Sequence, residues 1–346
     1  MTKFYIILDC IKRSNDIIAL YRVLFLSYLL MDGENQTTIQ SILLLGFQMP
    51  SPFKIPIFIL ILLLYSLTIT GNLLIISLVY GSPTLQHPMF FFLTHLSLSD
   101  ICLTTDIVPN MLYVIKSGPI SITMAACMTQ FQFFGTVVTF ECLLLAVMSY
   151  DRQLAICNPL RYASIMGNQL PLWLVIVCWS VSFTVTLGTV VMLTRLDFCN
   201  LSAIDHFFCD FDPILQLSCS DTAAVELEQM IIGSSVAVFP LGYITVTYIH
   251  IFICIFRISS KSGREKTFST CSSHLAIVST FFSTLIAIYV VPSRGTSLNV
   301  VSVLYTVVTP LSNSIIYSLR NSELRSAFKK HVNIYNICKM SKLSGL

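Results

Sequence analysis

The sequence predicts an all-α membrane protein: a bundle of seven transmembrane helices followed by a short amphipathic C-terminal helix. Of its 346 residues, 55% are hydrophobic and only 11% are charged, with a mean hydropathy of +0.80. A soluble domain carries roughly a quarter charged residues. Seven long apolar stretches follow residue 50, and Lys and Arg gather on one side of them. The bilayer is therefore the solvent in which the chain folds.

The apolar stretches set the helices and their order. They cover residues 55–80, 89–115, 124–157, 170–194, 224–256, 268–291 and 297–319. About 20 helical residues span a hydrocarbon core of about 30 Å, and backbone groups in lipid must bond within their own segment. We therefore divide the chain into an atypical N-terminal extension (1–30), a segment before the first helix (31–54), the transmembrane domain (55–319) and a tail (320–346).

The distribution of Lys and Arg predicts the orientation, because positively charged loops stay in the cytoplasm. One side carries twelve such residues: Arg152, Arg161, Arg257, Lys261, Arg264, Lys266, Arg320, Arg325, Lys329, Lys330, Lys339 and Lys342. With the extension before Met31 set aside, the other side carries four: Lys54, Lys116, Arg195 and Arg294. The tail is therefore cytoplasmic and residues 31–54 are extracellular, in a multi-pass protein of the plasma membrane surrounded by lipids.

The start of the tail predicts one more helix. Ser322 can cap it, and Leu324 and Phe328 lie four residues apart on one face. Such a helix lies along the membrane surface. A disordered basic tail is the alternative.

Four cysteines fall on the predicted outer side: Cys127, Cys199, Cys209 and Cys219. The oxidising exterior favours disulfides, but four cysteines permit three pairings and the residues alone do not choose. The other eight cysteines, among them Cys102, Cys142, Cys178 and Cys254, mostly lie within the apolar stretches, where cysteine acts as a small apolar residue. We assign them no chemistry.

Two glycosylation sequons begin at Asn35 and Asn200 on the outer side. Asn35 is the better candidate because it lies in the exposed N-terminal segment, whereas Asn200 adjoins Cys199.

Several function classes are disfavoured. The net charge of +3 is dispersed and forms no basic stripe, so no nucleic-acid partner is expected. The sequence lacks the GxSxG, HExxH and P-loop motifs and paired metal-ligand spacing. We therefore predict a protein that is not an enzyme and expect no cofactor or metal.

Eight motifs in order carry a resemblance that covers almost the whole chain from Glu34. They are Gly71-Asn72, PMFFFL (88–93), LSLSD (96–100), MSYDRQLAICNPLRY (148–162), HFFCD (206–210), LSCSDT (217–222), TFSTCSSH (267–274) and IIYSLRN (315–321). The sequence resembles the class II olfactory receptors of the rhodopsin-like G-protein-coupled receptor superfamily. The resemblance implies the rhodopsin-like bundle and two disulfides, Cys127–Cys209 and Cys199–Cys219.

The resemblance also implies roles at the inner face. Asp151 and Arg152 would form a charged pair that holds the resting state, and Tyr248 would meet Arg152 when the sixth helix swings out. The residues implied in G-protein coupling and activation are Asp151, Arg152, Tyr248, Lys266, His274 and Tyr317. An ionisable pair at the membrane edge is costly to leave unpaired, so its rearrangement makes a two-state element.

Four polar residues at membrane depth should face the bundle interior, because a charged carboxylate there costs about 3 kcal/mol. They are Asn72, Asp100, Glu141 and Asn313. By similarity they form the water and cation network of rhodopsin-like receptors. The alternative, which we weigh for Glu141 in particular, is polar contact that merely holds helices together.

The ligand site is predicted from a stripe on the third helix together with family positions on the fifth, sixth and seventh. The stripe contains Phe134, Gly135, Val138, Thr139 and Cys142, which recur at helical spacing. The corresponding family positions are Ile232, Val236, Phe282, Leu285, Ile286, Tyr289 and Thr306. Helix packing alone is the alternative for each residue. This lining suits a small, mostly apolar, odorant-like ligand with one hydrogen-bonding group and disfavours a cationic amine, since the stripe holds no acid.

We expect ligand binding to activate a heterotrimeric G protein of the stimulatory, olfactory type and so raise cyclic AMP. Two rival functions are a transporter or channel, although no inverted repeat is visible, and a receptor for an endogenous ligand outside the nose. The chain departs from the family pattern at Ser314, where proline is usual, at Gln153, where tyrosine is usual, and at Phe282-Ser283, which replace tyrosine and glycine. Family members begin near Met31, so we expect residues 1–30 to be an upstream extension of the gene model.

Overall fold

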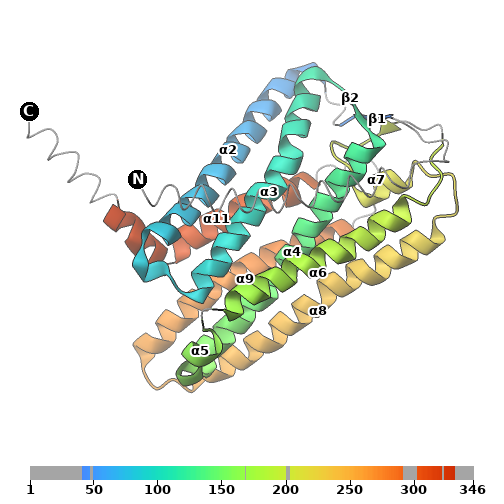
Figure 1. Cartoon of the computed structure of the whole chain (residues 1–346). Coiled ribbons are helices and arrows are strands. Elements are labelled where there is room, and N and C mark those ends of the chain that lie inside the picture. The colour runs from blue at the N-terminus through green and yellow to red at the C-terminus, as the bar shows by residue number, and fades with distance from the viewer. Residues whose placement is uncertain are drawn as a thin grey trace, which may run out of the picture.

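The computed structural model describes residues 41–46, 50–167, 169–199, 203–290, 302–321 and 323–331. Long helices pack side by side in a bundle, with short strands at one end and the short helix α5 (Pro159–Ile165) at the other (Figure 1). The long helices are α2 (Ser51–Gly81), α3 (Pro88–Ser117), α4 (Met124–Cys157), α6 (Leu170–Leu193), α8 (Ala223–Phe256) and α9 (Lys261–Val290). The 3-10 turn η1 (Pro83–Leu85) joins α2 to α3.

The helices match the predicted spans in order. Among the described residues, α2, α3, α4, α6 and α8 are each long and apolar enough to cross a membrane, and α9 has a shorter apolar part at Cys271–Ala287. The seventh position holds a π-helical turn, η2 (Leu304–Val308), which continues into α11 (Thr309–Arg320). Helix α9 begins earlier than predicted, at Lys261, because its first turns are polar and extend beyond the apolar run.

Helix α4 lies at the centre of the bundle. It packs against α3, α6, α8 and α9, and α2 packs along α3. About three fifths of the most apolar stretch of α3 and of α4 is buried (61% in each), against only 28–33% in α2, α6 and α8. Leu63, Val181 and Phe239 are examples of exposed apolar side chains. A broad apolar surface of this kind is stable only against lipid.

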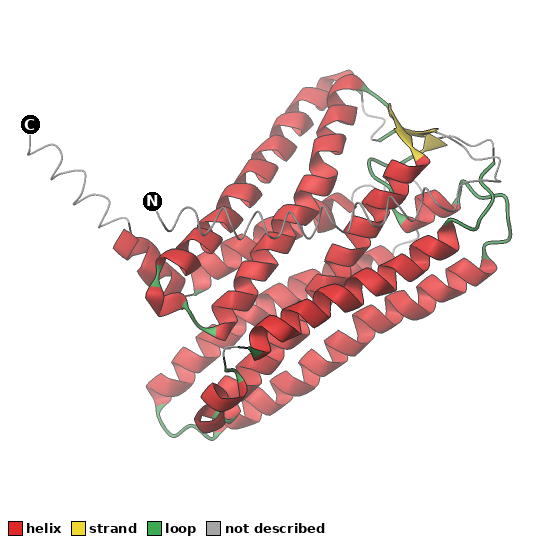
Figure 2. Cartoon of the chain, in the orientation of Figure 1, coloured by secondary structure: helices red, strands yellow, loops and turns green. Residues whose placement is uncertain are grey.

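A small sheet covers the outer end and was not predicted from the sequence. Its strands are β1 (Ser41–Leu44), β2 (Ile120–Thr123) and β3 (Ala203–Ile204), in the order β2-β1-β3, with β1 antiparallel to β2 and parallel to β3. Figure 2 shows the strands together at that end. Alternate residues Ile42 and Leu44 are buried. The strands are too short to be recognised before their partners are known.

Two disulfides hold the outer loop that precedes α8. Cys127 at the start of α4 is bonded to Cys209, and Cys199 is bonded to Cys219 within the loop. These are the pairs that the family resemblance implied. The loop also contains the short helix α7 (Phe211–Leu215), which lies at the same end as the sheet (Figure 1). Asn35 and Asn200, the two sequon positions, lie outside the described residues.

The inner end carries the short helix α5 (Pro159–Ile165) and a helical segment at residues 323–331. The side-chain oxygen of Asn321 accepts hydrogen bonds from the backbone N–H groups of Glu323 (3.0 Å) and Leu324 (3.2 Å). Asn321 therefore caps this segment, and the predicted cap, Ser322, lies outside the described residues. Leu324 is buried, whereas Phe328 on the same face is 44% exposed.

Candidate ligand-binding and signalling site

A cavity of about 740 Å³ lies in the outer half of the bundle between α4, α6, α8 and the outer loop. From α4 it is lined by Phe131, Phe134, Gly135, Val138, Thr139 and Cys142, from α6 by Val185, Thr186 and Thr189, and from α8 by Met230, Ile232, Gly233 and Val236. Leu285 and Tyr305 close it from α9 and η2. The α4 positions recur every three or four residues and so share one helical face.

The structure brings part of the predicted ligand site together. The predicted residues on the cavity wall are Phe134, Gly135, Val138, Thr139, Ile232, Val236 and Leu285. Phe282 and Thr306 are buried but do not line the cavity, and Ile286, which does not line it either, is 47% exposed. The side chain of Tyr289 lies outside the described part of the chain. Some predicted residues do not line the cavity because a shared family pattern does not specify how far each helix is rotated about its axis.

Helix α6 contributes a wall that the sequence did not predict, through Thr186 and Thr189. A Cβ atom at Gly135 would lie 2.6 Å from Thr186 Cγ2, closer than any normal contact. The absence of a side chain at Gly135 therefore lets α4 and α6 approach each other beside the cavity. Only the packed structure reveals which face of α6 takes part.

The outer mouth of the cavity is acidic. Asp210, Asp212 and Glu226 line it. Asp210 caps α7 by accepting a 2.8 Å hydrogen bond from the backbone N–H of Phe211. Burial, together with the nearby Asp212, raises the pKa of the Asp210 carboxyl to about 6. The predicted stripe on α4 holds no acid, so these carboxylates come from the loop and from the first turn of α8.

His206 anchors the outer loop to the seventh helix. It is fully buried, its Nε2 lies 3.1 Å from the Ser302 hydroxyl oxygen, and the Phe208 N–H donates to its Nδ1 at 3.4 Å. Burial lowers the pKa of His206 to about 3, so the ring is neutral. The ring of Phe208 in turn lies 5.1 Å from that of Phe134, between ring centroids. The loop thus reaches down onto the predicted stripe.

A second polar cluster lies deeper in the bundle. The Asn313 amide donates a 3.0 Å hydrogen bond to Asp100 Oδ1, and Glu141 lies within electrostatic reach of Asp100. The Asn72 amide donates to the Thr68 carbonyl at 3.1 Å. Asn72, Asp100, Glu141 and Asn313 are all buried, and each keeps one oxygen with no hydrogen-bond partner among the described residues. Buried polar atoms of this kind usually mark a site of function.

A third cluster occupies the inner half. The Tyr162 hydroxyl donates a 2.8 Å hydrogen bond to Asp151 Oδ1. Burial and the neighbouring Asp151 raise the pKa of Tyr162, so its hydroxyl keeps the donated proton. The family resemblance paired Asp151 with Arg152, but the carboxylate also has this partner from α5. The sequence did not predict this contact between Asp151 on α4 and Tyr162 in the second inner loop.

Arg152 points into this inner cluster. Its Nη2 is buried with no hydrogen-bond partner in the described part of the chain. It lies within electrostatic reach of Tyr248, His274 and Tyr317, which come from α8, α9 and α11. The Tyr248 hydroxyl is 2.7 Å from His274 Nδ1. The structure thus gathers the predicted inner residues, apart from Lys266, whose side chain lies outside the described residues.

Comparison with known proteins decides which family has this arrangement. The family model described as olfactory receptor matches residues 61–334. The chain belongs to the olfactory receptor family. It is 44% identical over 305 residues to Olfactory receptor 5G9 of Mus musculus, covering 87% of this chain and 97% of the relative. It is 43% identical over 303 residues to Olfactory receptor 11L1 of Homo sapiens, covering 87% and 94%.

The fold of this olfactory receptor is that of rhodopsin. The crystal structure of squid rhodopsin matches with a TM-score of 0.65 at 18% identity, over 84% of this chain and 89% of that one. The family and fold predicted from the motifs are therefore confirmed. The protein is a multi-pass membrane receptor and not an enzyme.

Two departures from the family pattern can be located in the receptor. Ser314 donates a 2.9 Å hydrogen bond to the Leu311 carbonyl, and its hydroxyl would lie 2.9 Å from a Cβ at Gly71. The irregularity of the seventh helix falls upstream, in the π-helical turn η2. Gln153 extends its amide nitrogen to within 2.8 Å of His250 Nδ1 on α8.

Proposed function

We propose that this olfactory receptor binds a small, mostly apolar molecule in the cavity beside α4 and then activates a stimulatory, olfactory-type G protein, which raises cyclic AMP. The cavity is the observation that supports this most directly. Its volume of about 740 Å³ lies within the range of about 300–1,000 Å³ that small-molecule sites occupy.

The lining supports the chemical class of the ligand. Phe134, Val138 and Ile232 present apolar surface, while Thr139 and Thr186 add hydroxyl groups. Apolar burial provides affinity and a few polar groups orient the ligand. An alcohol, aldehyde, ketone or ester of modest size meets both requirements. The carboxylates at the outer mouth make a matched amine a useful member of the test panel.

Helix α4 supports a route from the ligand to the G protein. Val138 and Arg152 lie on the same helix, fourteen residues and about 21 Å apart. Arg152 lies among Tyr248, His274 and Tyr317, each on a different helix. A cluster shared by separate helices can settle in two arrangements, and a ligand that favours one shifts the population. The arrangement with the inner ends apart would accept the G protein.

The test is a cyclic AMP assay on cells that express the full chain, with an odorant panel and with surface expression measured for every variant. Val138→Phe fills the cavity and should abolish the response. Val181→Phe makes the same change at a lipid-facing position of α6 that is 43% exposed and should leave the response intact. Arg152→Ala should remove signalling while keeping surface expression.

Each variant can refute one part of the proposal. A normal response from Val138→Phe would place the ligand elsewhere. Equal responses from wild type and Arg152→Ala would remove Arg152 from the mechanism. Ion current or solute flux through the purified protein in the absence of any G protein would favour a transporter or channel instead.

A further inference from the structure

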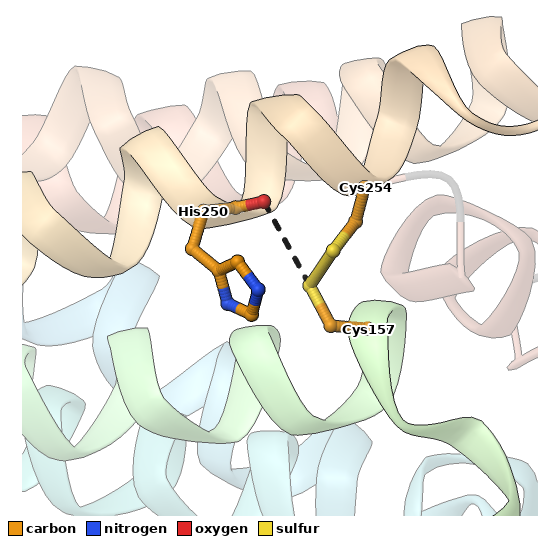
Figure 3. A group of neighbouring side chains, drawn as sticks. All are labelled: Cys157, His250 and Cys254. Carbon is orange, nitrogen blue, oxygen red and sulfur yellow. Dashed lines mark hydrogen bonds between the residues drawn. A yellow bond between two sulfur atoms is a disulfide. The ribbon is translucent and has the colours of Figure 1, made fainter.

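A cluster of metal-ligand side chains lies at the inner end of the bundle, away from the cavity. Cys157 comes from the last turn of α4, and His250 and Cys254 come from α8 (Figure 3). Their ligand atoms all lie within 4.8 Å of one another. The Cα atoms of the two cysteines are 5.7 Å apart, and their sulfurs are joined as a disulfide.

The location of Cys157 and Cys254 decides whether they are present in the cell as a disulfide or as two thiols. They lie at the same end as α5, which the distribution of Lys and Arg places in the cytosol. Glutathione and thioredoxin keep cytosolic thiols reduced, so a disulfide does not persist there. The cell therefore presents two thiols and an imidazole at this position. His250 is exposed and both cysteines are partly exposed, so an ion in the cytosol can reach them.

Helices α4 and α8 each contribute two polar side chains spaced four residues apart. His250 and Cys254 are four residues apart on α8, and Gln153 and Cys157 are four residues apart on α4, so each pair lies on one face of its helix. The Gln153 amide lies 2.8 Å from His250 Nδ1, and Cys157 Sγ lies 3.9 Å from the His250 carbonyl oxygen. The two faces therefore meet, and the four side chains lie together.

We infer that Cys157, His250 and Cys254 bind one Zn²⁺ ion when the thiols are reduced. Two cysteines and one histidine, with a water in the fourth place, form a known zinc ligand set. Tetrahedral bonds of about 2.3 Å to sulfur and about 2.0 Å to nitrogen put ligand atoms about 3.5–3.8 Å apart. The ligand atoms lie within 4.8 Å of one another, so the imidazole nitrogen and a sulfur need approach by about 1 Å at most. Once the disulfide is reduced, the two sulfurs separate to about 3.8 Å by side-chain rotation.

Binding involves no change in oxidation state. The Zn²⁺ ion forms two Zn–S bonds as both S–H bonds break, and the two protons pass to water. The neutral imidazole donates a nitrogen lone pair. Thiolate ligands favour zinc over magnesium and calcium, which prefer oxygen.

Gln153 is a positioning residue for this site. A histidine that binds a metal through one ring nitrogen usually gives the other N–H to a nearby acceptor, which fixes the ring. The amide oxygen and nitrogen of Gln153 are interchangeable by a flip, so its oxygen can accept that N–H. The family pattern has tyrosine at this position. The departure at Gln153 thus coincides with the metal cluster.

One consequence rests on the proposed function. Zinc would tie α4 to α8 about one turn beyond Arg152 and so hold the inner ends of these helices together. Separation of the inner helices would then require more ligand. Removal of zinc should lower the ligand concentration that half-activates the receptor.

The binding test uses the full-length receptor in phospholipid nanodiscs, kept reduced by a phosphine that does not bind metals. Co²⁺ serves as the spectroscopic probe, and Zn²⁺ is then added in competition with a coloured chelator. One ion per receptor and a thiolate-to-cobalt charge-transfer band are expected, and Zn²⁺ should displace the band. Cys157→Ser, Cys254→Ser and His250→Ala should each weaken binding by more than the about 10–100-fold expected for Gln153→Ala. Cys178→Ser, at a buried free cysteine of α6, is the matched control and should bind as wild type does.

Size-exclusion chromatography of each variant checks folding, and because three ligands are tested separately, one misfolded variant does not remove the test. No cobalt–thiolate band in the reduced wild type would overturn the site, as would an unchanged band in the Cys157→Ser, Cys254→Ser double variant. Rapid alkylation of intact cells that finds these cysteines bonded to each other would overturn it too. If binding holds but a zinc chelator leaves the cyclic AMP response unchanged, only the functional consequence fails.

Discussion

Replacing Gly135 with alanine should destabilise the receptor, whereas the same change at Gly242 should stabilise it. The new Cβ at Gly135 would lie 2.6 Å from Thr186 Cγ2. Thr186 cannot easily turn away, because its χ1 angle is restricted and its hydroxyl donates a 3.0 Å hydrogen bond to the Ser182 carbonyl. At Gly242, in α8, a Cβ would meet nothing within 4 Å.

The magnitudes follow from two opposing effects. Alanine is favoured over glycine inside a helix by about 1 kcal/mol, which acts at both positions. Overpacking costs about 1–3 kcal/mol and acts only at Gly135. The free energies of unfolding of the two variants should therefore differ by about 1–3 kcal/mol. With about 2 °C per kcal/mol for a chain of this size, the difference in Tm is about 2–6 °C.

Thermal unfolding of the purified receptors in one detergent measures this difference. Thr186→Ser removes the clashing methyl group and keeps the hydroxyl, so it should restore most of the Tm lost in Gly135→Ala. Equal Tm values for Gly135→Ala and Gly242→Ala would refute the close approach of α4 and α6. Failure of Thr186→Ser to restore Tm would assign the loss to another neighbour.

Three further predictions concern the outer loop and the inner cluster. The disulfides close loops of 82 and 20 residues. Cys127→Ser should therefore lower the free energy of unfolding by about 4.5 kcal/mol, and Cys199→Ser by about 3.3 kcal/mol. A larger loss for Cys199→Ser than for Cys127→Ser in denaturant unfolding would contradict this. The raised pKa of Asp210, about 6, means that its contribution to stability is present below about pH 4 and lost as the pH rises through 6. Asp210→Asn, which can still cap α7, should therefore raise Tm at about pH 7 more than at about pH 4, and a pH-independent difference would show that burial of the charge is not the cause. Tyr162→Phe removes a hydrogen bond to Asp151, and a hydrogen bond to a charged group is worth about 1.5–3 kcal/mol. The variant should therefore raise basal cyclic AMP. Unchanged basal cyclic AMP at equal surface expression would show that this hydrogen bond does not stabilise the resting state.

The predictions that succeeded concern composition and local pattern. The third and fourth helices begin at the predicted residues because the apolar runs start there abruptly, at Met124 and Leu170. Helix α9 extends to Lys261 because helical hydrogen bonds continue into water, where hydropathy carries no information. Asn321 caps the segment after α11, a role that only backbone geometry reveals, and the predicted cap, Ser322, lies outside the described residues.

Most contacts between segments far apart in the chain could not be predicted from the sequence. The sheet joins three segments from residues 41 to 204, and its strands have two to four residues each, too short for a period to show. Cys157 and Cys254 were assigned no chemistry because they lie 97 residues apart, and their spacing resembles no metal motif. Their significance arises only when α4 and α8 pack side by side.

The sequence alone determined the seven-helix membrane fold, its orientation and the family, because hydropathy, charge asymmetry and motifs are local properties that survive without contacts. The tertiary structure decided which side chains share a space: the α6 wall of the cavity, the acidic mouth, the Tyr162–Asp151 contact and the cluster of Cys157, His250 and Cys254. Each of these depends on the rotation and separation of packed helices. Those quantities are set by the sum of many small side-chain contacts and leave no repeating signature along one chain.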